Sequence, residues 1–271
     1  MLFEFAADVA KLAFFVASAY ALISVLARGR RAPWAVQLTT RRLALLVVLT
    51  LAVSGIKVIE DVLAKESGPV DAAVLWFIRE HVPTALTGFF AAVSLSGSAN
   101  FLLPAGVVVT VVLLFARRRY EALLVGGSLG AAALLVWGIK AIVGRARPAL
   151  WDAQWAWGSS FPSGHTLSSA AFLTAVALCV ARIWPRAGQL AMVFAVLWTG
   201  LVALSRLILG VHWPSDVLAA LCMGVFIPVL ISLAHDLRHR QPRADGPAGE
   251  SLSTVPIFKF DQDQGRSGPG Q

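Results

Sequence analysis

Charged residues are scarce in this chain. They make up 14% of its 271 residues, whereas a soluble domain carries about a quarter. Hydrophobic residues make up 58%. This composition does not fit a soluble globular protein, and it is typical of a polytopic membrane protein that forms one compact helical domain.

Cysteine is also scarce. The chain has two, Cys179 and Cys222, and both lie inside apolar runs without the spacing of a metal site. We interpret them as small core residues. The sequence therefore predicts neither a disulfide framework nor a zinc site, and the cysteines give no indication of the redox compartment.

Seven apolar segments are long enough to cross a bilayer, which takes about 20 residues. They cover approximately residues 5–27, 43–64, 100–116, 121–141, 164–183, 188–209 and 215–235. These segments predict an all-α fold, a membrane helix bundle of about seven transmembrane helices. We expect a single membrane domain over residues 1–235 and a disordered cytoplasmic tail over 236–271, which is rich in Gly, Pro, Gln and charge.

A shorter apolar stretch lies between the second and third segments. Residues 70–82 are too few to span a bilayer, and Pro69 and Pro83 bracket them. This pattern predicts one or two helices that lie at the membrane interface or between the spans.

The net charge is +8, but the cations stand between apolar segments rather than on one face or arm. This distribution argues against nucleic-acid binding.

Arginines occur in every second connection between the apolar segments and again after the last segment. All these regions lie on one side of the membrane if the spans alternate in direction. The positive-inside rule makes that side cytoplasmic, which places the N-terminus outside and the C-terminus in the cytoplasm.

Three polar clusters stand at the ends of apolar segments that this topology places outside. Charge at a membrane boundary is costly, so a chain that concentrates it in this way is expected to use it. The clusters are Lys140 with Arg147-Pro148; Pro162-Ser163-Gly164-His165; and Ser205-Arg206 with His212 and Asp216.

These residue types suit a phosphoryl group. Lys140, Arg147 and Arg206 supply three cations, and guanidinium forks match phosphate oxygens. Ser163 and Gly164 begin a predicted helix, where free N–H groups and the helix dipole favour an anion. The sequence therefore predicts a phosphate-binding pocket on the outer side.

Two histidines and a carboxylate supply the chemistry. A neutral imidazole can attack phosphorus and form a phosphohistidine, provided that an acceptor holds its other nitrogen. Asp216 follows His212 by four residues and can take that role, while His165 can protonate the leaving oxygen and later activate water. No cluster of Asp, Glu and His predicts a metal site, and we expect no cofactor.

The ordered pattern resembles the type 2 phosphatidic acid phosphatase superfamily. The resemblance implies a six-helix core over about residues 43–235, with the first segment as an additional helix. It implies His212 as nucleophile, oriented by Asp216, and His165 as general acid and base. It also implies that Lys140, Arg147, Ser163, Gly164 and Arg206 bind the phosphoryl oxygens, without metal.

From this we predict a metal-independent phosphatase in a bacterial inner membrane. It would hydrolyse a lipid phosphate or diphosphate, such as undecaprenyl diphosphate, phosphatidylglycerol phosphate or phosphatidate, at an extracytoplasmic site. A phosphotransferase with the same site is the close alternative, and a non-enzymatic lipid transporter is a more distant one. The partners expected are the lipid phosphate and the bilayer, with no nucleic acid and no obligate protein partner.

Two further polar groups leave alternatives open. Arg145, two residues before the Arg147-Pro148 pair, is either an additional contact to substrate or headgroup, or an interface anchor. Lys57 and Asp61 have the spacing of an ion pair along one helix, or they contact the site indirectly.

Overall fold

The computed structural model describes residues 2–27, 41–151 and 158–239, and these form helices joined by turns, with no strand among them. The predicted all-α class is therefore confirmed. In chain order the elements are α1 (Leu2–Ala27), α3 (Arg42–Leu63), α4 (Gly68–His81), the 3₁₀ turn η1 (Thr84–Leu86), α5 (Thr87–Ser96), α6 (Ala99–Phe115), α7 (Arg119–Val143), α8 (Gly164–Ile183), the 3₁₀ turn η2 (Pro185–Ala187), α9 (Gly188–Ile208) and α10 (Pro214–His239).

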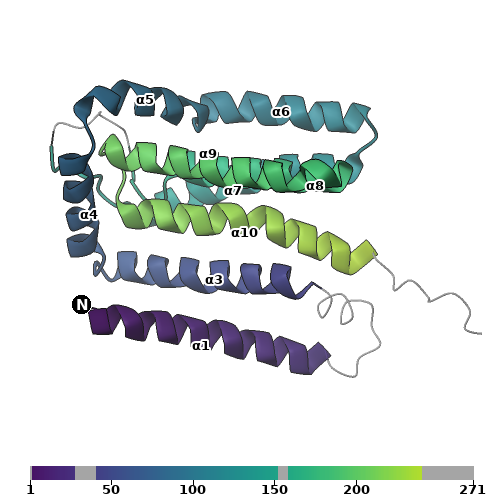
Figure 1. Cartoon of the computed structure of the whole chain (residues 1–271), viewed down its shortest axis with the longest axis horizontal. Helices are drawn as coiled ribbons and strands as arrows, with labels where there is room; N and C mark the ends of the chain where they lie inside the picture. Colours follow the sequence, from purple (N-terminus) through teal and green to yellow (C-terminus); the bar gives the residue numbers. More distant parts are fainter. Residues whose placement is uncertain (1, 28–40, 152–157, 240–271) are drawn as a thin grey trace, which may run out of the picture. The chain divides into compact units, whose positions relative to one another are not determined.

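Six of the described helices are long and apolar enough to cross a membrane: α1, α3, α7, α8, α9 and α10. A seventh span results if Thr84–Ser96 and Ala99–Phe115, which meet at a 40° bend, are counted together. The prediction of about seven spans is confirmed, but the third is broken. The helix expected over 100–116 is preceded by α5, which lies end to end with α6 in the upper layer of Figure 1.

Large apolar side chains on the outside of the bundle indicate what surrounds it. Leu43, Phe115 and Ile142 are more than 80% exposed. Exposure of such side chains to water costs about 1.5–3 kcal/mol each, and a bilayer removes that cost. The chain is therefore an integral membrane protein.

Close packing of α8 against α10 determines where two of the polar clusters lie, because both helices begin at the same end of the bundle. Small residues line this contact, as is common between membrane helices. Gly224 is one of them. A Cβ atom there would lie 2.5 Å from Ala170 Cβ and 2.6 Å from the Leu167 carbonyl oxygen. Only glycine permits this approach without a shift of one helix.

The helix α4 runs across the ends of the long helices (Figure 1). It corresponds to the short helix predicted from residues 70–82. Asp71, in its first turn, is 2% exposed, which is unusual for a carboxylate. This helix thus brings a buried acid to the end of the bundle where the polar clusters lie.

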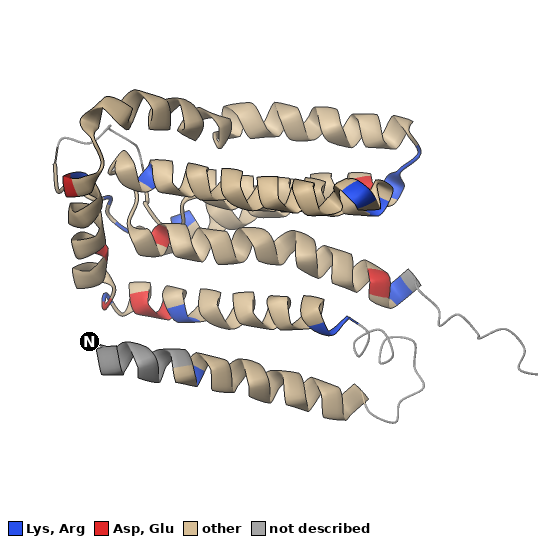
Figure 2. Ribbon diagram, in the orientation of Figure 1, with Lys and Arg blue, Asp and Glu red and all other residues tan. Residues whose placement is uncertain are grey.

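The opposite end carries Lys and Arg residues at the ends of the long helices (Figure 2). Arg182 on α8 lies 3.7 Å from Glu121 on α7 and 3.6 Å from Asp236 on α10, and Arg41 lies 2.8 Å from Asp236. Part of the positive charge used to predict topology is therefore paired within the protein. Residues 28–40, with three of the predicted arginines, and 240–271, with most of the predicted tail, lie outside the described residues.

Candidate functional site

All three polar clusters meet at the α4 end of the bundle. Lys140 is in the last turn of α7, and Arg147 follows in the connection to α8. Ser163 precedes α8, and His165 is in its first turn. Arg206 is in the last turn of α9, and His212 and Asp216 flank the start of α10. Helix ends distant in sequence thus supply one site.

His212 lies between a carboxylate and a guanidinium. It is 2% exposed, and its Nδ1 is 3.5 Å from Asp216 Oδ2. This separation is longer than an ordinary hydrogen bond, and among the described residues Nδ1 has no other partner at hydrogen-bonding distance. Nε2 lies 3.4 Å from Arg147 Nη1. Because a guanidinium can only donate, Nε2 carries the lone pair, and the ring proton faces Asp216.

The imidazole of His212 is held in its neutral form. Burial lowers its pKa to about 4, and the charges of Arg206 and Arg147 act in the same direction, against the opposing effect of Asp216. A neutral ring has the lone pair that a nucleophile needs.

Arg147 is fixed by backbone carbonyls. Its Nη1 donates to the Val211 carbonyl over 2.8 Å and its Nε to the Gly158 carbonyl over 3.2 Å. Burial lowers the pKa of this guanidinium, and Asp216 opposes the shift. The two carbonyls hold the cation beside His212, and its role in binding phosphate remains a prediction.

The Pro162–His165 cluster begins a helix, as predicted. Ser163 is the residue before the first turn of α8; it is fully buried, and its hydroxyl lies 2.9 Å from the Thr166 hydroxyl. The Ser163 backbone N–H donates to the Asp216 carbonyl oxygen over 3.2 Å, which connects this cluster to α10. The following N–H groups at Gly164 and His165 lie in the first turn, where an α-helix offers them no internal acceptor.

Arg206 approaches the site from α9. It is 8% exposed, its Nη1 donates a hydrogen bond to the hydroxyl of Ser94 on α5, and its Nε is buried with no described residue at hydrogen-bonding distance. Ser94 was not predicted from the sequence. Nothing in a serine within an apolar helix distinguishes it from many others.

An apolar cavity of about 350 Å³ adjoins this polar site. Lys140, Gly164 and His165 form its polar edge, and side chains of α6, α7 and α8 such as Leu103, Ala133 and Val136 form the remainder. A site that combines cationic side chains with an apolar cavity can take an amphiphile.

Arg145 occupies a position that neither alternative from the sequence anticipated. Its Nη1 donates to Asp216 Oδ1 over 2.6 Å, and its Nη2 donates to Asp71 Oδ2 over 2.7 Å. It thus joins α4 to α10 through two carboxylates. Asp71 was also missed, because an acid in the first turn of a helix is usually explained by the helix dipole.

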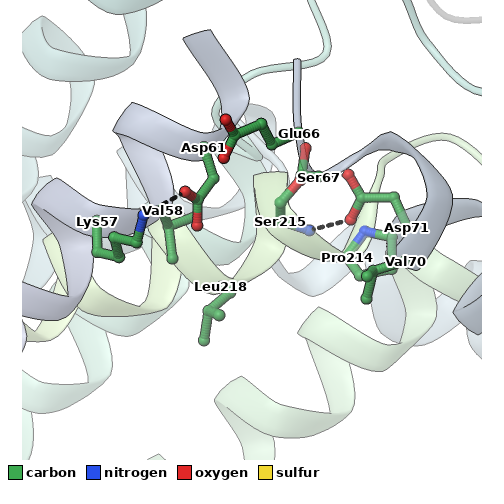
Figure 3. Close-up of a pocket in the computed structure, with 10 residues that line it drawn as sticks. All are labelled: Lys57, Val58, Asp61, Glu66, Ser67, Val70, Asp71, Pro214, Ser215 and Leu218. Atoms are coloured by element: carbon green, nitrogen blue, oxygen red, sulfur yellow. Dashed lines mark hydrogen bonds and ion pairs between the residues drawn. The ribbon is translucent and has the colours of Figure 1, made fainter. Parts of the chain in front are cut away.

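Asp71 also lines a second cavity, of about 490 Å³ (Figure 3). Its polar lining includes Lys57 and Asp61, whose Nζ and Oδ1 atoms are 2.7 Å apart. The predicted ion pair along α3 is therefore confirmed. In Figure 3 this pair and Asp71 lie on different elements of the lining, and Asp71 is the carboxylate to which Arg145 Nη2 donates.

Within the part of the chain that the structure describes, no three His, Cys, Asp or Glu residues are arranged to hold a metal ion. The phosphate-binding groups expected from the sequence are side-chain cations and backbone N–H groups. The absence of a metal requirement remains a prediction.

Part of this chain is similar to known proteins. The PAP2 superfamily matches residues 121–240. Phosphatidylglycerophosphatase B of Bacillus subtilis (strain 168) is 29% identical over 138 residues, which cover 50% of this chain and 68% of the relative. Phosphatidylglycerophosphatase B of Escherichia coli (strain K12) is 41% identical over 63 residues, but these cover only 23% of this chain and 24% of that protein.

A crystal structure of a transmembrane PAP2-type phosphatidylglycerolphosphate phosphatase from Bacillus subtilis has the same fold. Its TM-score is 0.62 at 24% identity, over 70% of this chain and 99% of that chain. The match of residues 121–240 to the PAP2 superfamily confirms the resemblance stated from the motifs.

Proposed function

We propose that this protein is a membrane phosphatase that hydrolyses a lipid phosphate or diphosphate through a phosphohistidine on His212. The observation that carries the proposal is the environment of the His212 ring. Nε2 carries its lone pair beside Arg147, Nδ1 faces Asp216, and burial keeps the ring neutral. This is the arrangement required for attack on phosphorus.

In the first step Nε2 of His212 bonds to phosphorus as the bond to the lipid oxygen breaks. That oxygen takes a proton from His165. The charge of a bound phosphate favours the protonated form of His165. In the second step a water molecule loses a proton to His165 and attacks phosphorus, and the phosphorus–nitrogen bond breaks to release inorganic phosphate.

The cations act on the phosphoryl oxygens. Lys140, Arg147 and Arg206, with the N–H groups that follow Ser163, would stabilise the charge that spreads over these oxygens in the transition state. The 3.5 Å contact between His212 and Asp216 would shorten once the ring becomes positive, because such contacts often tighten only in the reacting complex.

The lipid character of the substrate is supported by the apolar cavity at Lys140 and His165. Its lining comes from α7 and α8, which are long enough to cross the membrane, and from α6, one half of the broken span. An acyl or prenyl chain could therefore occupy it while the phosphate meets the cations. Phosphatidylglycerol phosphate, undecaprenyl diphosphate and phosphatidate all combine such a chain with a terminal phosphate.

The test is a panel of these three lipids with the full-length protein purified in detergent. We expect release of inorganic phosphate from at least one of them, and none from the His212→Ala variant. Retention of the phosphate in a new lipid would indicate a phosphotransferase instead. Failure with all three lipids, or equal release by the variant, would refute the proposed hydrolase.

We further propose that the site faces the extracytoplasmic side of a bacterial inner membrane. The support is the arginines at the end opposite α4 (Figure 2). Reporter fusions at residue 36 and at the C-terminus should both be cytoplasmic. If either lies outside, the site faces the cytoplasm or the number of spans is wrong.

A further inference from the structure

The side chain of Arg145 connects three separate elements of the protein at the edge of the site. It comes from the connection that follows α7. Its Nη1 donates to Asp216 on α10, and its Nη2 donates to Asp71 on α4, over 2.6 and 2.7 Å. The side chains of Asp216 and Asp71 are 0% and 3% exposed, and that of Arg145 is 16% exposed. This is a nearly dry ionic bridge.

Asp71 also fixes the helix that carries Asp216. Its Oδ1 accepts the Ser215 backbone N–H over 2.9 Å, and its Oδ2 accepts the Ser215 hydroxyl over 2.6 Å. Figure 3 shows this contact between α4 and the start of α10. Asp71 therefore acts on Asp216 by two routes, through Arg145 and through the neighbouring residue.

The charges in this bridge matter for His212. Two carboxylates share one guanidinium, so the group as a whole carries one negative charge. If Arg145 faced Asp216 alone, the pair would be neutral and would stabilise a positive ring less. Because Asp71 offsets the charge of Arg145, Arg145 can hold Asp216 rigidly while the three side chains together keep one negative charge. That charge stabilises the imidazolium of His212.

We propose that Arg145 and Asp71 are positioning residues for the reaction: Arg145 holds Asp216 against His212, and Asp71 holds Arg145 and offsets its charge. The proposal rests on the function proposed above. Asp71 is on a helix that precedes the matched PAP2 domain, so the motifs within that domain do not include it. The contacts of both Nη atoms with carboxylates distinguish this role from a direct contact with substrate phosphate.

The experiment compares four variants of the full-length enzyme on one water-soluble aryl phosphate. They are Asp71→Asn, Arg145→Lys, Arg145→Ala and the double variant Asp71→Asn/Arg145→Ala. Asp61→Asn is the matched control, because it removes a carboxylate at the edge of the same cavity that is paired with Lys57 instead. Each protein is first checked for a monodisperse size-exclusion profile.

We expect kcat to fall about 10–100-fold for Asp71→Asn, which is typical of residues that orient a reacting group, with KM within about threefold. Arg145→Lys should retain more kcat than Arg145→Ala, since an ammonium can still pair with Asp216. The double variant should be no slower than Arg145→Ala alone. An asparagine oxygen can still accept the Ser215 N–H, so the second substitution mainly removes a charge whose partner Arg145 is already absent. Asp61→Asn should match the wild type.

Several results would overturn the proposal. One is an increase in KM with little change in kcat. Another is a fall in kcat of the double variant that equals the product of the two single falls. The third is an equal effect of Asp71→Asn and Asp61→Asn. If Arg145→Ala does not fold, the double variant Asp71→Asn/Arg145→Lys replaces it, and multiplied losses again count against the bridge. A wild type that is inactive on the aryl phosphate and on all three lipids would refute the proposed function, and if it hydrolyses only a lipid, the variants are compared on that lipid. An active wild type with an unaffected Asp71→Asn variant refutes only this inference.

Discussion

Arg206 Nη1 donates a hydrogen bond to Ser94 Oγ, although the two residues are 112 positions apart in the sequence. The contact joins the last turn of α9 to α5, the first half of the broken span. An arginine without this acceptor would lie buried with one more unsatisfied N–H group. The broken span therefore has a direct role in fixing a cation that is predicted to bind phosphate.

Replacement of Ser94 by alanine should weaken phosphate binding. Loss of a hydrogen bond to a charged group costs about 1.5–3 kcal/mol, which corresponds to about a 10–100-fold fall in kcat/KM. The inhibition constant of vanadate, a phosphate analogue, should rise as well. Ser96→Ala is the control, because the Ser96 hydroxyl accepts from Trp198 Nε1 over 3.1 Å and does not contact Arg206. Equal effects of the two substitutions would contradict the assignment.

His165→Ala should affect substrates according to their leaving groups. Removal of a general acid typically costs about 10²–10⁴ in rate when the leaving group is a poor one such as a lipid alkoxide. An aryl phosphate needs less proton donation and should be partly spared in the first step. Rapid-quench labelling with an aryl phosphate should give acid-labile phosphohistidine in this variant and none in His212→Ala. Label on the His212 variant would show that the roles are assigned wrongly.

The pKa of His212 can be measured directly. Burial and the nearby arginines lower it to about 4, so the ring should stay neutral from pH 8 down to about pH 5 and gain its proton only near pH 4. The chain has five histidines, and ¹³C-histidine NMR of wild type and His212→Ala would assign the resonance. Titration near the ordinary value of about 6.5 would mean that the ring is more hydrated than the structure shows.

Activity should not depend on divalent metal. The site has three cationic side chains, and no metal-binding group of three His, Cys, Asp or Glu exists among the residues described. We expect dialysis against EDTA to leave phosphate release unchanged and vanadate to inhibit it. Loss of activity on dialysis, restored by magnesium, would falsify the metal-independent mechanism.

Two glycines should respond oppositely to alanine. Gly224→Ala places a methyl group 2.5 Å from Ala170 Cβ and 2.6 Å from a backbone oxygen of α8, so helices must move apart at a cost of about 1–3 kcal/mol. Gly200, within α9, has no described neighbour within 4 Å of the place a Cβ atom would take, and alanine there should stabilise by up to about 1 kcal/mol. Thermal unfolding in detergent should show a lower Tm for the first variant only.

The spans and the motif residues could be predicted from sequence because both are local signals. Apolar length predicted seven spans, six of which are single long helices, and the residue types in the motifs predicted which helix ends would meet. The break between α5 and α6 was not predicted. Gly97 lies there, and a Cβ atom on it would come within 3 Å of Val202 and Ser169. That restriction comes from another helix and leaves no local pattern.

The supporting residues were missed for a related reason. Arg145 and Asp71 are 74 positions apart, and each has an adequate explanation on its own as an interface anchor or a helix-dipole acid. Only their contact shows that they work together. Residue type indicates what chemistry a side chain can do, whereas its partner across the fold decides which chemistry it serves.

The contact between Arg206 and Ser94 also defines how much of the chain a working unit must contain. A fragment beginning at residue 121 would keep the whole PAP2 match and every motif residue. It would lack Ser94 and Asp71, which hold Arg206 and Arg145. Such a fragment would have every reactive group predicted here but not the acceptors that fix two of its arginines, so we expect an active form of this protein to include α4 and α5.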